Sequence, residues 1–156
     1  MANLKTSYMD IALKNPIIAG ATTLTCQMES IKRLEEAGAA ALVTCSLFEE
    51  EVQLERFRMQ EELEIFDNVH PEMTDIFPEL EHAGPTEHLT WVRKTKESVG
   101  IPVIASLNCV NPETWVEYAK LMAETGVDGL ELNFYSTPTD IERQGGTIED
   151  AQGQIV

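Results

Sequence analysis

Short apolar runs alternate with amphipathic stretches along most of the chain, and this alternation predicts strands and helices in turn. The apolar runs are Pro16–Ala21, Ala39–Thr44, Pro102–Leu107 and Leu130–Phe134. Continuous apolar strands are typical of parallel sheets that helices cover. Because such strands alternate here with helical patterns, we predict an α/β fold with about four parallel strands.

The helical stretches carry their own start and stop signals. Gln27–Ala37 has apolar residues at helical spacing and is followed by Gly38, and Thr86–Val99 precedes Gly100. A third helix is predicted to start at Asn111, which suits an N-cap, with proline in the first helical position. Its predicted apolar stripe is Trp115, Tyr118, Ala119 and Met122, and Gly126 closes it.

Three segments lie outside this alternation. Residues 1–15 predict a small hairpin with Met9 and Asp10 at its turn. Residues 47–85 mix helix-forming composition with prolines, and we interpret them as an excursion with one or two helical pieces. After Pro138 the chain is polar and contains glycines, and helix-like spacing resumes at AQGQIV, residues 151–156.

The net charge of -16 bears on the choice of partners. Nucleic acid and anionic membranes are disfavoured, because binding them requires clustered Lys and Arg. The densest acidic run, Glu49–Glu64, is expected on an exposed helix or loop. We find no apolar run of about 18 residues and no secretory pattern at the N-terminus, so we expect a cytoplasmic protein.

The cysteines and histidines do not predict a metal site. Cys26, Cys45 and Cys109 are far apart and form no CxxC pair, so we expect reduced thiols. The histidines lack a usual ligand spacing and are expected on the surface; they are His70, His82 and His88.

Small and polar residues follow the predicted strands, where parallel α/β folds bind ligands. Gly20, with Ala21 after it, leaves room for a flat ring close to the backbone. Ser46, beside Cys45, can donate to a ligand carbonyl, and Asn108 and Asn133 offer both donors and acceptors to a heterocycle. Each of these residues also has a purely structural explanation: loop geometry for Gly20, packing for Cys45, and capping of backbone loops for the asparagines.

Two further observations bear on the chemistry. Neither a P-loop nor a GxGxxG motif is present, so the usual nucleotide fingerprints are missing. Ser106 is another polar residue near the end of its strand, and Ser136 is a possible proton-transfer group, although no base stands beside it in sequence.

Three segments together resemble the dihydroorotate dehydrogenase family. They are NPIIAGATTLT, GAAALVTCSLFEE and IPVIASLNCVNPETWVEYAKLMAETGVDGLELNFY, and the last is also similar to a segment of dihydropyrimidine dehydrogenase. SLFEEE points to the dihydroorotate dehydrogenase-like branch. The resemblance implies a (β/α)8 TIM barrel with FMN at the carboxyl ends of its strands. The resemblance covers most of residues 3–140 and only the N-terminal half of the family, so we expect residues 1–156 to form a single partial FMN-type barrel domain.

The resemblance also implies roles for individual residues. The flavin would lie over Ala19, Gly20 and Ala21 and contact Cys45 and Ser46. Asn133 would face flavin and substrate, and Ser136 would be the catalytic base. Cys45 stands where the family usually carries Lys, and LNFYSTPT replaces the pattern LNxSCPN.

These observations support three functional hypotheses. The first is an FMN-dependent oxidoreductase of pyrimidine metabolism that transfers a hydride between a small dihydropyrimidine-like molecule and flavin. The second is a non-enzymatic half-barrel that self-associates, with weak or no flavin binding; either way we expect a homo-oligomer. The third, a Schiff-base or phosphate-binding barrel enzyme, needs a strand-end Lys that none of the predicted strands carries.

Overall fold

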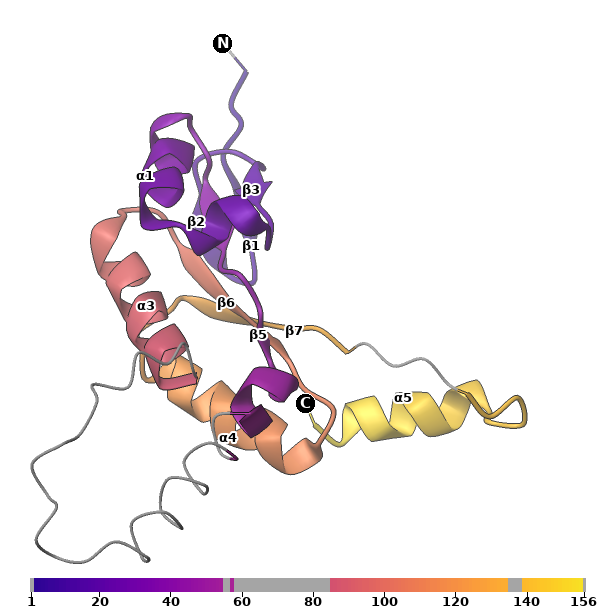
Figure 1. The fold of residues 1–156 in the computed structure, drawn as a ribbon. Helices are drawn as coiled ribbons and strands as arrows, with labels where there is room; N and C mark the ends of the chain where they lie inside the picture. The colour runs from indigo at the N-terminus through magenta and orange to yellow at the C-terminus, as the bar shows by residue number, and fades with distance from the viewer. Residues whose placement is uncertain (1, 55–56, 58–84, 135–138, 156) are drawn as a thin grey trace, which may run out of the picture.

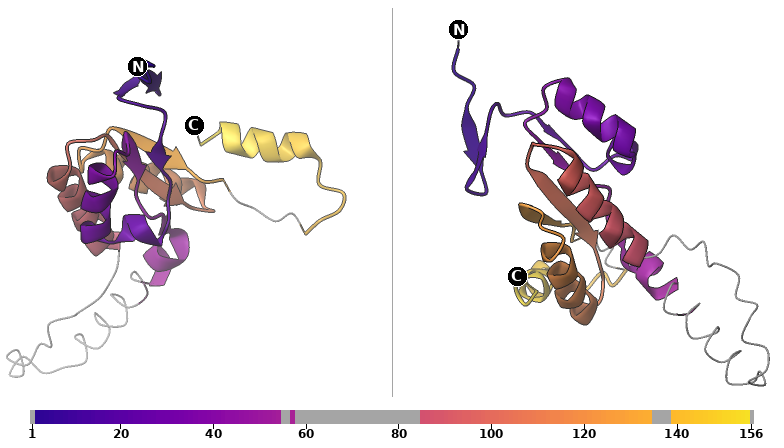
Figure 2. Two further views of the ribbon diagram at one scale, coloured as in Figure 1. Left: turned by 90° about the horizontal axis from the view of Figure 1, so that it is seen from above. Right: turned by 90° about the vertical axis from the view of Figure 1, so that its left-hand side faces the viewer.

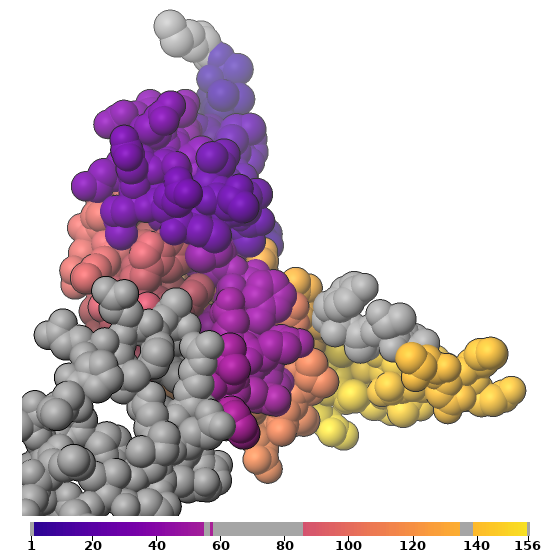
Figure 3. Space-filling view, in the orientation of Figure 1, coloured from indigo at the N-terminus to yellow at the C-terminus, as the bar shows by residue number. Residues whose placement is uncertain are grey.

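The computed structural model describes residues 2–54, 57, 85–134 and 139–155. A parallel sheet has helices along one side and a two-stranded hairpin on the other (Figures 1 and 2). The C-terminal helix projects from this body as an arm (Figure 3). In chain order the elements are β1 (Thr6–Tyr8), β2 (Ile11–Leu13), β3 (Ile18–Ala19), η1 (Thr23–Cys26), α1 (Met28–Glu36), β4 (Ala41–Val43), β5 (Leu47–Phe48), α3 (Pro85–Ser98), β6 (Val103–Asn108), α4 (Pro112–Ala123), β7 (Gly129–Leu132) and α5 (Gly145–Gly153).

The main sheet is parallel throughout, with β6 at its centre. The strands β4 and β5 both pair with one edge of β6, and β7 pairs with the other edge. Val43 pairs with Ile104 and Leu47 pairs with Leu107, so three residues on one strand oppose two on the other. Such an extra residue is a β-bulge, and β4 and β5 are therefore two parts of one strand.

With the bulged strand counted once, the sheet order is β3, β4/β5, β6, β7, which is also the order along the chain. The predicted α/β fold is confirmed, and its architecture is that of half a TIM barrel. Two expectations are corrected. Leu47 and Phe48 belong to the sheet rather than to the excursion, and α5 begins at Gly145 rather than at residue 151.

The core lies between the sheet and the helices. Side chains alternate along β6, so that Val103, Ala105 and Leu107 face the helices. The larger cluster joins Leu107 to Trp115 and Met122 of α4, all at most 1% exposed. Burying one such side chain contributes about 1.5–3 kcal/mol. The predicted apolar stripe of α4 is confirmed, with Tyr118 buried and Ala119 partly buried against the same cluster.

The predicted helix ends are also confirmed. Gly38 and Gly126 have φ of 100° and 85°, values that side-chain-bearing residues adopt at a cost of roughly 1–2 kcal/mol. The Asn111 side chain accepts a hydrogen bond from Glu113 N at 3.0 Å, with Pro112 opening the helix. These local signals determine where the helices begin and end.

The predicted hairpin forms and lies against the sheet face opposite the helices (Figure 2). Met9 and Asp10 have φ of 53° and 59°, as in the two-residue turns that match strand twist. Leu13 packs against the start of β4. A Cβ added to Gly129 would lie 2.9 Å from Met9 Cε, so the glycine makes room for the hairpin turn at the amino end of β7.

Glu49 corrects the expectation that the whole acidic run is exposed. It begins the helical segment after β5, whose described part is residues 49–54 and 57, and is only 4% exposed. Its carboxylate accepts hydrogen bonds from Val110 N at 2.5 Å and Asn111 N at 2.8 Å. Burial raises the pKa of Glu49, but these amides, Gln53 and Thr114 outweigh that effect and lower it overall.

In the described part of the chain, no helix combines the length and the apolar character that crossing a membrane requires.

We predict that Glu49→Ala lowers the free energy of unfolding by about 1.5–3 kcal/mol, because two amides lose a charged acceptor. The neighbouring exposed Glu50→Ala is the control and should stay within about 0.5 kcal/mol. Because folding lowers the Glu49 pKa, its stabilisation is present above the ordinary value of 4.5 and is lost as pH falls through the folded-state value. Urea unfolding across this pH range measures both effects; equal losses in the two variants would contradict the prediction.

Candidate functional site

Three neighbouring strands contribute a chain of polar side chains to the sheet face opposite the helices, which we call the inner face. Ser46 Oγ lies 2.7 Å from Ser106 Oγ, and Ser106 Oγ donates to Glu131 Oε1 at 2.8 Å. Ser106 is fully buried, Ser46 is half-buried and Glu131 is exposed. The chain therefore runs from the β4–β5 junction across β6 to β7.

The bulge explains why Ser46 reaches Ser106. At the bulge the ladder between the strands is interrupted, and Ser106 N donates to the hydroxyl of Thr44 at 3.2 Å. A bulge re-aims the side chains of its strand. Ser46 is thereby placed over the inner face, opposite the helix side to which Leu47 contributes its side chain.

A cavity of about 470 Å³ adjoins this polar chain and includes Glu131 in its lining. Its volume is within the range of small-molecule sites, roughly 300–1,000 Å³. Most of the residues that line it are apolar, and the hairpin forms one of its sides through Tyr8 and Met9. The lining residues are Tyr8, Met9, Ile18, Gly20, Val43, Ile104, Leu130, Glu131 and Leu132.

The structure brings only part of the predicted first-strand site to this cavity. Gly20 lines it, and a Cβ built on Gly20 would meet no atom within 4 Å, so the space above it is open. Ala21 is exposed just beyond the strand. Ala19 instead packs against the apolar cluster beneath α1, so its side chain lies on the helix side of the sheet.

Cys45 lies in the bulge next to Ser46 and is half-buried. Burial, together with the neighbouring Cys26 thiol, raises the pKa of Cys45 to about 12. A neutral thiol therefore stands at this position at physiological pH, and it supplies no positive charge to the inner face.

The two predicted asparagines end adjacent strands. Asn108 is half-buried and, by alternation along β6, shares the inner face with Ser106. Asn133 follows β7, is exposed, and its backbone N–H still bonds to Leu107 O at 2.9 Å. Among the described residues, neither asparagine side chain forms a hydrogen bond with another residue; the loop that follows Asn133 lies outside the described residues. Ser136 lies outside the described residues.

Sequence reasoning missed Glu131. Its signal was present, because a charged residue between Leu130 and Leu132 in a buried strand must face a different environment from its neighbours. Ser106 was recognised as polar, but the contacts of its hydroxyl with Ser46 and Glu131 depend on the bulge and on the register of β7, which no local pattern specifies.

Within the described ranges, the remaining titratable groups do not assemble into a second centre. His88 is half-buried beside Trp91, and burial lowers its pKa to about 4, so the expectation of a surface histidine is wrong for it. His70 and His82 lie outside the described residues. Among the residues that are described, no group of three His, Cys, Asp or Glu side chains is placed to hold a metal ion.

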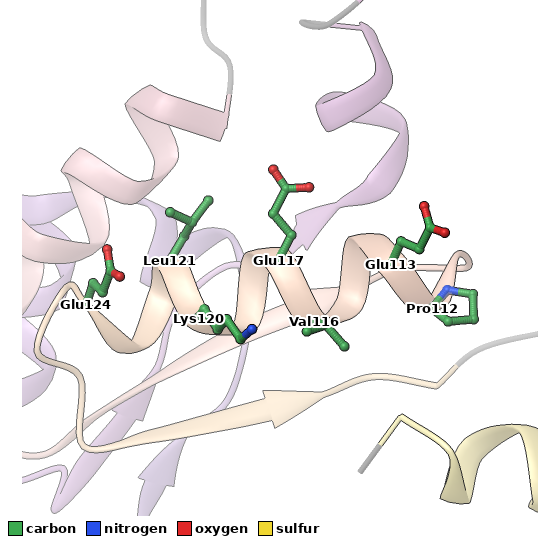
Figure 4. Close-up of a pocket in the computed structure, with 7 residues that line it drawn as sticks. All are labelled: Pro112, Glu113, Val116, Glu117, Lys120, Leu121 and Glu124. Atoms are coloured by element: carbon green, nitrogen blue, oxygen red, sulfur yellow. The ribbon is translucent and has the colours of Figure 1, made fainter.

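Two other hollows lie away from the inner face. One, of about 750 Å³, runs along the outer flank of α4 and is lined mainly by Glu and aliphatic side chains of successive turns (Figure 4). The other, of about 230 Å³, lies between α5 and the start of α4. Neither of these two hollows, as lined by described residues, contains residues of the polar chain.

Comparison with known proteins does not assign a family: no family model matches the sequence, and no curated protein matches it significantly. The fold and the site together define a half-barrel α/β protein whose polar groups gather at the carboxyl ends of parallel strands.

We predict that a thiol-alkylating reagent at pH 8 modifies Cys26 well before Cys45 or Cys109. Cys26 is exposed, whereas burial raises the pKa of both other thiols to about 12 and keeps them protonated. Mass spectrometry after graded labelling gives the order. A Cys26→Ser control should remove the fast phase, and rapid labelling of Cys45 in the native protein would contradict the burial described here.

Proposed function

We propose that this chain binds the isoalloxazine ring of FMN on its inner face and acts as an FMN-dependent oxidoreductase of the dihydroorotate dehydrogenase type. The observation that carries the proposal is the open space above Gly20, beside a cavity whose neighbouring strands present Ser46, Asn108 and Glu131. The substrate class that the resemblance suggests is a dihydropyrimidine.

The inner face fits the ring of such a cofactor. A flat ring needs an apolar floor and close approach to the backbone, which Val43, Ile104 and Gly20 provide. Its amide edge needs donors and acceptors together, which the side chains of Asn108 and Asn133 can offer. When bound, the flavin would accept the hydride, while these residues would bind and orient it.

The same face does not fit the cofactor's phosphate. Among the described residues, none that lines the cavity or forms the polar chain is basic, and Glu131 brings a carboxylate. Cys45 offers a neutral thiol where a lysine would stabilise an anionic reduced ring. The fit therefore concerns the ring alone, and binding should depend little on the phosphate.

We predict that the purified protein binds riboflavin and FMN with affinities within about fivefold of each other, since one hydrogen bond to the phosphate is worth only about 1 kcal/mol. Gly20→Leu should weaken both by at least about tenfold, because its side chain fills the space of the ring. Gly146→Leu in α5 is the matched control, since its Cβ also meets nothing within 4 Å. Quenching of flavin fluorescence measures binding.

Failure of both flavins to bind the native protein would refute the proposal. If flavin binds, anaerobic addition of a dihydropyrimidine tests the chemistry, because hydride transfer bleaches the visible flavin absorbance. Binding without bleaching would leave a flavin-binding protein and reject the proposed substrate class. Ser136 remains a predicted proton acceptor, and Ser136→Ala should slow bleaching without weakening flavin binding.

A second candidate is self-association without catalysis, favoured by the edges of the sheet. Within the described residues, β3 and β7 each pair with a strand on one side only. Unpaired edges are templates for another chain, and eight parallel strands close a barrel. We predict that sedimentation shows a concentration-dependent dimer in this case, and that Leu132→Pro, which removes an edge N–H donor, shifts it to monomer. A colourless monomer at all concentrations would contradict this candidate.

We also propose a cytoplasmic location. All three cysteines are free in the structure, and free thiols persist in reducing compartments.

A further inference from the structure

Two of the three cysteine side chains meet at the carboxyl ends of adjacent strands. Cys26 ends the η1 turn that follows β3, and Cys45 lies in the bulge that follows β4, which pairs with β3 in parallel. The two thiols are hydrogen-bonded to each other. Neither cysteine belongs to the described lining of the cavity or to the chain of polar side chains, so this contact needs its own explanation.

The local structure holds the two thiols in one arrangement. The turn that carries Cys26 is fixed by the fully buried Thr25, whose hydroxyl accepts from Thr22 N at 3.0 Å and donates to Thr22 O at 2.9 Å. The Cys26 thiol donates to Thr22 O at 3.3 Å, so its single proton is committed. The bond between the thiols therefore uses the proton of Cys45, and the Cys45 thiol points at the Cys26 sulfur.

The two thiols differ in their access to solvent. Cys26 is exposed, whereas Cys45 is half-buried. Oxidants attack exposed thiols first, and an oxidised cysteine condenses with a second thiol beside it to form a disulfide. Cys26 is therefore placed as the site of attack, with Cys45 in contact with it as the resolving thiol.

We propose that Cys26 and Cys45 form a peroxide-sensitive pair that closes into a disulfide at the rim of the inner face. First, the Cys26 sulfur attacks the peroxide and the O–O bond breaks. Cys26 becomes a sulfenic acid, and the peroxide takes up the thiol proton and is reduced to water or an alcohol. Next, the Cys45 sulfur attacks the Cys26 sulfur, the S–O bond breaks, and the hydroxyl leaves with the Cys45 proton as water.

The disulfide would join two elements that carry the inner face. Gly20 stands just before the turn that ends at Cys26, and Ser46 follows Cys45 in the bulge. The loop that the bond closes contains α1 and β4, so oxidation should stabilise the folded chain. This role needs no flavin, and it goes beyond the proposed function.

Treating the reduced full chain with hydrogen peroxide tests the pair. Peptide mapping by mass spectrometry should find a linked Cys26–Cys45 peptide that has lost two hydrogen atoms and that dithiothreitol restores. The free Cys45 thiol should disappear at least about tenfold faster than in Cys26→Ser, which lacks the site of attack. Cys109→Ser is the matched control: Cys109 is buried, and its loss should leave the linked peptide unchanged.

Cys45→Ser distinguishes a pair from a single exposed thiol. Without the resolving thiol, sulfenic acid should accumulate on Cys26 and be trapped by dimedone, which should label the native protein far less. After peroxide treatment, the urea midpoint of the native protein should rise relative to that of Cys45→Ser treated in the same way. A lasting sulfenic acid on Cys26 of the native protein would overturn the proposal. So would Cys26 linked mainly to a second copy of the chain, or equal urea midpoints.

Discussion

The structure depends on β6, which carries the pairing on both of its edges and the packing on both of its faces. Its residues Val103–Leu107 are all buried: Ala105 and Leu107 lie in one cluster with α4, Val103 lies in the cluster beneath α1, and the others lie toward the inner face. Because β4, β5 and β7 all take their register from β6, the placement of every polar group at the strand ends follows from this one strand. A shift of one residue along it would exchange the two faces.

The candidate site arises where the regular sheet is interrupted. The extra residue between Val43 and Leu47 lets Ser46 reach Ser106, while Thr44 replaces a backbone acceptor with its hydroxyl. Glu131 completes the chain from the far strand. The buried Ser106 hydroxyl has hydrogen-bond partners on both sides, so its burial leaves no unsatisfied polar group.

Much of the fold was predictable because its signals are local. The strand of β6, the stripe of α4 and the glycines at positive φ each follow from spacing and backbone sterics alone. The bulge was not predictable, since one additional residue leaves the apolar pattern unchanged. The burial of Glu49 and the role of Glu131 depend on which amides and hydroxyls other strands bring to them. The start of α5 was hidden by two glycines, which disfavour helices in isolation.

The hairpin has a consequence for access to the inner face. Its turn presses Met9 against the amino end of β7 at Gly129, and its second strand covers the start of β4 through Leu13. The hairpin therefore covers the sheet at the amino ends of these strands. A molecule that reaches the cavity from the opposite rim passes the serine and asparagine side chains before it meets the apolar lining residues, so that recognition precedes burial.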